Sequence, residues 1–146
     1  MISEYIEHAR NFKYMSGIER DTLRTKQTAE VFTPTELVQE ILDNMDQSIF
    51  EDSEKTFLDN SCGDGQILSE VVIRKMELSQ CTLEQALSTI YGVDIMPDNI
   101  ELCKKRLMGP NPTESIIKIL NTNIQCQDAL EYDYSFGQPV GVENFY

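Results

Sequence analysis

The chain contains no tryptophan, one histidine and no closely spaced pair of cysteines, and these shortages exclude several kinds of site. Its four cysteines, Cys62, Cys81, Cys103 and Cys126, are scattered through 146 residues with no CxxC pair. Such spacing predicts neither a zinc site nor a disulfide framework. The single histidine, His8, argues further against a metal centre built on imidazole. We therefore expect reduced thiols, no bound metal and a cytoplasmic protein.

Long apolar runs are also missing. No stretch approaches the ~20 apolar residues that a membrane-spanning helix needs. The N-terminal stretch MISEYIEHARNFKYM carries acids and lacks the apolar segment of a signal peptide. The sequence therefore predicts no contact with a membrane.

Basic residues are scarce. Twelve lysines and arginines face 25 aspartates and glutamates, which gives a net charge of −13. Duplex DNA is a dense polyanion, and the proteins that hold it usually offer lysine and arginine. An acidic balance more often reflects solubility than function. We expect the chain to bind DNA poorly alone, and therefore only with a partner.

The pattern of apolar residues predicts one α/β domain. A chain of this length, with 40% hydrophobic residues, can bury a core of its own. Apolar periodicity predicts helices over 2–15, 35–45, 65–78, 82–90, 97–108 and 113–120, and strands over 56–59, 90–95 and 123–128. Residues 46–55 are expected to form a polar connector, and one more strand is expected around 140–145. The alternating order predicts a parallel sheet.

The stretch FLDNSCGDGQIL, residues 57–68, passes from a predicted strand into a predicted helix through a turn with two glycines. This geometry can hold a ligand at the N-terminus of the helix, and glycine lets the backbone approach a ligand closely. The third glycine of a dinucleotide fingerprint is missing, and Asp59 would repel a pyrophosphate. A cation or a hydroxyl-rich ligand suits Asp59 better, and a tight turn without a ligand is the alternative.

Two further acids follow predicted strands. Asp94 ends IYGVD, and Asp128 follows NIQCQ. An acid at the carboxyl end of the second strand can accept both hydroxyls of a ribose, and an acid after the third can accept the exocyclic amine of an adenine. Together with Asp59 they predict a nucleoside ligand at one edge of the sheet. The alternatives are that Asp94 caps the helix that begins at Pro97, or that all three are loop acids of an acidic protein.

The stretches EVFTP, FLDNSCGDGQIL, IYGVDI and CQDAL occur in the order found in adenine-specific, amino-group DNA methyltransferases of the gamma type. Over residues 18–133 the chain resembles phage and restriction-modification enzymes of this family. The resemblance implies a Rossmann-like S-adenosylmethionine methyltransferase fold in a bacterial or phage-infected cell. It divides the chain into an N-terminal helical segment (1–30), a cofactor-binding core (31–133) and a tail (134–146).

The resemblance also implies the contacts of the N-terminal motif. Phe32 and Thr33, followed by Pro34, match the residues that pack on the methionine end and the adenine of the cofactor. The alternative for Phe32 is a hydrophobic staple on the following helix.

The glycine turn matches the family's glycine-rich loop. The backbone around Ser61, Cys62, Gly63 and Gly65 would hold the methionine carboxylate of S-adenosylmethionine. Asp59 would face the methionine amine, directly or through water.

The remaining matches concern the nucleoside. Asp94 would bind the ribose, and Ile95 would cover the adenine ring. Asp128 would accept the adenine amine, with Ala129 beside it.

The chain departs from the family in its loop and in its catalytic signature. Asn60 stands where proline is common, and Asp64 stands between the two glycines where a small or neutral residue is usual. The signature Asn, Asp or Ser followed by Pro-Pro and an aromatic residue is absent. Its nearest counterpart is the terminal VENFY, with Asn144 and Tyr146 as weak catalytic candidates.

These features predict a truncated fold with three to four mostly parallel strands. The first strand would lie at an edge of the sheet unless the tail covers it, and exposed edges are usually paired. We therefore expect a homodimer or a partner subunit. The expected function is that of a methyltransferase-like protein that is inactive alone or needs a partner. The alternatives are a non-catalytic module that sequesters cofactor or interferes with a methyltransferase, and a domain for another adenosine ligand.

Overall fold

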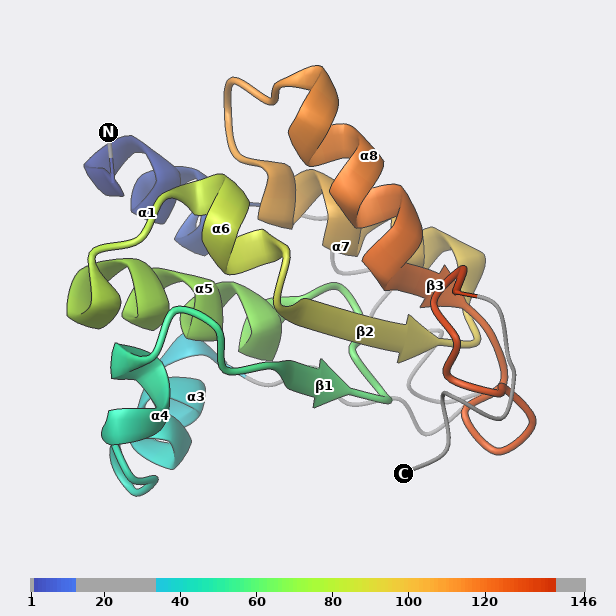
Figure 1. Cartoon of the computed structure of the whole chain (residues 1–146), viewed down its shortest axis with the longest axis horizontal. Coiled ribbons are helices and arrows are strands. Elements are labelled where there is room, and N and C mark those ends of the chain that lie inside the picture. The colour runs from blue at the N-terminus through green and yellow to red at the C-terminus, as the bar shows by residue number, and fades with distance from the viewer. Residues whose placement is uncertain (1, 13–33, 139–146) are drawn as a thin grey trace.

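A computed structural model describes residues 2–12 and 34–138 and shows a three-stranded parallel sheet flanked by helices (Figure 1). The helices are α1 (Ile2–Arg10), α3 (Thr35–Asp43), α4 (Ser48–Glu51), α5 (Gln66–Ser79), α6 (Leu83–Leu87), α7 (Pro97–Met108) and α8 (Glu114–Asn123). The strands are β1 (Phe57–Asp59), β2 (Ile90–Asp94) and β3 (Ile124–Cys126). The predicted α/β class with a parallel sheet is confirmed.

The sheet has the order β1-β2-β3, so β2 is central and β1 is an edge strand among the described residues. Asp59 pairs with Gly92, and Asp94 pairs with Cys126. Because all the pairings are parallel, the carboxyl ends of the three strands lie at one edge. The fourth strand expected around 140–145 lies outside the described residues.

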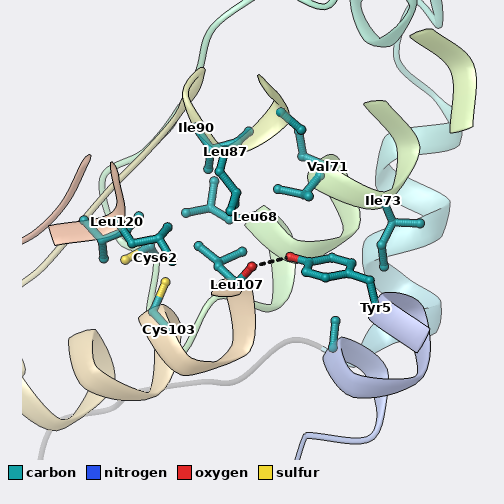
Figure 2. Packing of buried hydrophobic residues seen from close by; sticks show 14 of the residues in the cluster. Tyr5, Cys62, Leu68, Val71, Ile73, Leu87, Ile90, Cys103, Leu107 and Leu120 are labelled. Carbon is teal, nitrogen blue, oxygen red and sulfur yellow. Dashed lines mark hydrogen bonds between the residues drawn. The ribbon is translucent and has the colours of Figure 1, made fainter. Parts of the chain in front are cut away.

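Helix α5 covers one face of the sheet and is buried along most of its length. Leu68, Val71, Val72 and Ile73 are all buried, and they join residues of β2 and α7 in one core (Figure 2). Gly92 of β2 allows this close approach. A Cβ atom at Gly92 would lie 2.9 Å from Cδ1 of Leu68.

The structure corrects the expected polar connector over 46–55, which contains the short helix α4. The Asp46 carboxylate accepts a hydrogen bond of 3.0 Å from the backbone N–H of Ser48, at the first residue of this helix. Phe50 is fully buried and stacks on Phe57 at 5.4 Å between ring centroids. One aromatic side chain thus anchors a segment that is otherwise polar.

The chain after β3 covers the other face of the sheet with aromatic rings. Tyr91 alternates along β2 with Ile90 and Gly92, so its side chain lies on the face away from α5. The Phe136 ring packs on Tyr91 at 4.8 Å between centroids, and Tyr132 meets Phe136 edge to face at 5.3 Å. This cover was not predicted from the sequence.

Replacing Gly92 with alanine should destabilise the fold. The added methyl would press on Leu68, Cys62 and Ile124 at 2.9 to 3.1 Å, and such overpacking typically costs about 1–3 kcal/mol. Urea unfolding of Gly92→Ala measures this cost. The control is Ser115→Ala at an exposed position of α8, which should change the free energy of unfolding by less than about 0.5 kcal/mol. Equal stability of the Gly92→Ala protein and the wild type would contradict this packing.

Candidate functional site

The acids predicted at the strand ends follow the carboxyl edge of the sheet in a regular stagger. Asp59 ends β1 opposite Gly92, and Asp94 lies two residues further along β2. Asp94 in turn lies opposite Cys126, and Asp128 lies two residues beyond it. From strand spacing and rise, the Cα atoms of Asp59 and Asp94 are about 8 Å apart. The register therefore places Asp59 and Asp94 on the same side of neighbouring strands.

Asp59 is half-buried and carries a perturbed carboxyl group. Burial raises its pKa, the backbone N–H of Ser61 lowers it, and the negative charge of Asp94 raises it further. The hydrogen bond from Ser61 N to Oδ1 of Asp59 measures 3.0 Å. Two carboxylates that repel each other at a partly buried edge favour a ligand group that is cationic or donates hydrogen bonds.

Asp94 is held in place from within the fold. Its Oδ2 accepts hydrogen bonds from Nδ2 of the buried Asn99 at 3.0 Å and from the backbone N–H of Met96 at 3.3 Å. The N-cap of α7 is Met96 and not Asp94, so the alternative that Asp94 caps this helix is wrong, although Asp94 does accept the Met96 N–H just before it. Its Oδ1 accepts no hydrogen bond from the described residues and remains for a ligand. The orienting residue Asn99 was missed, although its place two residues after Pro97 on α7 was a usable signal.

The glycine turn connects β1 to α5, and its two glycines have different structural roles. The backbone N–H of Cys62 donates to the carbonyl of Val93 at 3.0 Å, which ties the turn to β2. Gly63 and Gly65 have positive φ angles of 54° and 91°. A Cβ atom at Gly65 would lie 2.9 Å from Sγ of Cys103, whereas a Cβ atom at Gly63 would meet nothing within 4 Å. Gly65 is thus required for packing, and Gly63 borders open space where a ligand can approach.

The side chain of Cys62 points into the core toward Cys103 (Figure 2). A hydrogen bond with the Cys103 thiol and burial both raise the pKa of Cys62. Because the thiolate is the nucleophilic form of cysteine, Cys62 is unsuited to nucleophilic chemistry. Only its backbone can contribute to a ligand site. The neighbouring Ser61 is exposed, and its backbone N–H donates to Oδ1 of Asp59.

Asp64 turns inward and meets Arg106 of α7. Its Oδ2 lies 3.4 Å from a guanidinium nitrogen, and its carbonyl accepts a bond of 3.1 Å from Nε of Arg106. The same guanidinium donates to the carbonyl of Ala9 in α1 at 2.9 Å. Asp64 and Arg106 are both buried. The unusual acid between the glycines, Asp64, therefore has a structural partner in Arg106. The sequence CKKRL gave no sign that this arginine is buried.

The third acid, Asp128, belongs to a turn of its own. It is exposed, and its Oδ1 accepts a hydrogen bond of 2.9 Å from the backbone N–H of Leu130. No described contact joins it to Asp59 or Asp94. Ala129 is half-buried, and its carbonyl accepts a bond of 2.6 Å from the Tyr134 hydroxyl.

Two exposed apolar side chains border this edge. Ile95 directly follows Asp94 and is 60% exposed, as a residue that covers a ligand ring would be. Leu130, which was not predicted as a site residue, is 94% exposed two residues after Asp128.

Four predicted site residues lie outside the described residues: Phe32, Thr33, Asn144 and Tyr146. The N-terminal motif and the weak catalytic candidates therefore remain predictions.

A large hollow formed by the described residues lies elsewhere. It measures about 600 Å³ and is lined by Ile2, Met76, Leu83 and Met108 among others, near the amino ends of the strands. We place the candidate site at the carboxyl edge because the perturbed carboxyl group of Asp59 and the open glycine Gly63 are found there. Within residues 2–12 and 34–138, no three histidine, cysteine or acidic side chains are grouped to hold a metal ion. In the same ranges, no helix combines the length and apolar character needed to cross a bilayer.

Comparison with known proteins gives no relative: no family model, no curated protein and no solved structure matches the chain. The described residues thus define an α/β domain with acids and an open glycine turn at the carboxyl ends of a parallel sheet.

Asp64 should give the protein a measurable pH dependence. Burial raises its pKa to about 6, despite Arg106 and the backbone N–H groups of Asp64 and Gln66. Because this pKa lies above its unfolded value of about 3.9, the folded state binds the proton more readily. The contribution of Asp64 to the free energy of unfolding is therefore complete below about pH 4. It falls by about 2–3 kcal/mol as the pH rises to about 6. The raised pKa of Asp59 adds in the same direction.

Urea unfolding between pH 4 and pH 7 tests this dependence. In Asp64→Asn the decline of the unfolding free energy between pH 4 and pH 6 should be much shallower, because asparagine does not titrate. An unchanged slope in this variant would contradict the assignment to Asp64.

Proposed function

We propose that the chain binds S-adenosylmethionine at the carboxyl edge of its sheet, as the cofactor half of a methyltransferase-like protein. The observation that carries the proposal is the carboxylate of Asp94, which ends the central strand. Asn99 fixes its Oδ2 while Oδ1 remains for a ligand. A carboxylate so placed can accept the hydroxyls of a ribose. The resemblance to adenine-specific DNA methyltransferases supplies the identity of the nucleoside.

The charge of the cofactor suits this edge. S-adenosylmethionine carries a sulfonium and an ammonium group against one carboxylate, so its net charge is positive. Asp59 would hold the ammonium group, and the backbone at Gly63, with the N-terminal N–H groups of α5, would hold the carboxylate. Ile95 would cover the adenine ring, with Leu130 at the same rim and Asp128 accepting the adenine amine. Asp128 has to leave its contact with the backbone of Leu130, or share it, to do so.

Methyl transfer to DNA would require a partner. The cofactor supplies the methyl group, and the chain supplies its binding and orientation. The Pro-Pro signature that holds a flipped adenine is absent from the sequence, and a net charge of −13 opposes DNA binding. We therefore propose that a partner subunit, or a second copy, provides the groups that contact the target base and covers the edge of β1.

The same charge favours a second candidate, a non-catalytic module that binds the cofactor and interferes with a methyltransferase or restriction system. Both candidates share the cofactor site and differ in whether methyl transfer follows.

Replacing Asp94 with alanine should weaken the binding of S-adenosylmethionine at least tenfold, measured by titration calorimetry. The loss follows because hydrogen bonds to a charged group contribute about 1.5–3 kcal/mol, and tenfold corresponds to about 1.4 kcal/mol. The matched control is Glu114→Ala, which removes an exposed acid at the first turn of α8 and should bind within about twofold of the wild type. Equal binding by the Asp94→Ala protein would show that the ribose assignment is wrong.

The nature of the ligand is tested by titrating S-adenosylhomocysteine, adenosine and NAD in parallel. S-adenosylmethionine and its demethylated product should bind more tightly than NAD, because Asp59 and Asp94 repel a pyrophosphate. Tighter binding of NAD would instead indicate a domain for a different adenosine ligand. Transfer of a labelled methyl group to DNA, with and without host-cell extract, separates the enzyme from the non-catalytic module.

A further inference from the structure

Helix α3 carries two apolar stripes, although a surface helix usually needs one. Val38 and Leu42 are buried against the core. Leu37 and Ile41 lie four residues apart on α3, and Met45 follows just after the helix ends at Asp43; the three side chains are 46%, 46% and 43% exposed. Residues four apart lie on the same side of a helix. The second stripe therefore forms an exposed apolar ridge beside the buried one.

This ridge lies in a segment that contains acids and no bases. Residues 34–54 include no lysine, arginine or histidine. They include seven exposed acids: Glu36, Glu40, Asp43, Asp46, Glu51, Asp52 and Glu54. Among the described residues, Asp43 forms an ion pair with Arg74 at 2.8 Å, and Asp52 interacts electrostatically with the buried Lys75. We call these seven acids, with Leu37, Ile41 and Met45, the α3–α4 surface.

We propose that the α3–α4 surface binds a cationic amphipathic helix of a partner protein. The apolar side of such a helix would cover the ridge, and its lysines and arginines would face the acids. The binding of an amphipathic helix through anchors spaced by three or four residues is a recurrent mode of recognition, and complementary charge both speeds association and selects the partner.

Charge distinguishes this occupant from the others that an apolar ridge could attract. A second copy would bring two acid-rich surfaces together without bases in either 34–54 segment to offset them. An anionic lipid surface or a nucleic acid would be repelled in the same way. A basic helix alone satisfies both the ridge and its acidic surroundings.

The surface is separate from the cofactor site. Helices α3 and α4 both pack on α5, and Figure 1 shows them at the side of the molecule away from the arrowheads of β2 and β3. The inference goes beyond the proposed cofactor binding and does not depend on it.

The experiment uses the whole chain and two synthetic 18-residue peptides of leucine and lysine. In one peptide the leucines form a single helical face, and in the other the same residues are scrambled. Fluorescence anisotropy should show at least tenfold tighter binding of the amphipathic peptide, and amide chemical shifts should change within residues 34–54. Equal binding of the two peptides, or shifts confined to other elements, would overturn the proposal.

Paired variants locate the binding site. Leu37→Gln with Ile41→Gln should weaken binding of the amphipathic peptide at least tenfold. The control is Leu78→Gln with Ile117→Gln, which removes two other exposed apolar side chains, 44% and 40% exposed, and should change binding less than twofold. Glu36→Gln with Glu40→Gln should weaken binding severalfold at low salt and less at high salt. The proposal would be overturned if the peptide bound both double variants, the one at Leu37 and Ile41 and the one at Glu36 and Glu40, as tightly as the wild type.

Two further arms test the other occupants. Sedimentation of the wild type and of the Leu37→Gln, Ile41→Gln protein should show the same oligomeric state. Phosphatidylglycerol vesicles should not bind the chain. Self-association through the ridge would overturn the proposal in favour of a second copy as the occupant. Vesicle binding would overturn it in favour of a membrane.

Discussion

The position of the candidate site depends on the contacts that the guanidinium group of Arg106 makes. This group joins the carbonyl and carboxylate of Asp64 in the glycine turn to the carbonyl of Ala9 in α1, all beneath the surface. A buried ion pair of this kind adds little net stability, because both charges lose their hydration. Removing one partner is costly, however, since the other is then buried without compensation. The contact therefore fixes where the turn lies and with it the position of Gly63, the residue before Asp64.

Burial raises the pKa of Asp64 despite Arg106, and burial acts in the same direction on Asp59 at the carboxyl edge. Burial and the neighbouring charge of Asp94 raise the pKa of Asp59, so its ionised form is disfavoured in the fold. Perturbed groups of this sort gather at functional sites, although structural networks also produce them. Asp64 differs from Asp59 and Asp94 in having Arg106 as a buried partner, which lowers its pKa without cancelling the effect of burial. A cationic ligand with hydroxyl groups would relieve the repulsion between Asp59 and Asp94, which is why they are more easily explained as a site than as a scaffold.

The elements that sequence patterns predicted well are those whose burial follows a simple period. Helix α7 begins at Pro97 and ends before Gly109, as expected, and the capping box at Thr82 begins α6. The failures arise where tertiary contacts override composition. Phe50 turns a polar connector into α4, and Lys75 is fully buried because its ammonium group donates to the carbonyls of Ser53 and Lys55. Spacing cannot reveal that a charged residue has found partners inside.

The same reasoning applies to the site. Positions at strand ends were predictable from the order of the elements, because parallel strands bring their carboxyl ends together. The direction of each side chain was not, and Asp128 illustrates the difference, since it closes a turn at Leu130. The acidic excess had no single explanation from composition alone. Ten of the 25 acids lie at the carboxyl edge of the sheet or on the α3–α4 surface, the two places where we propose that ligands bind. Both binding partners would be cations, so a charge that disfavours DNA would select them, and their separate elements allow both to bind at once.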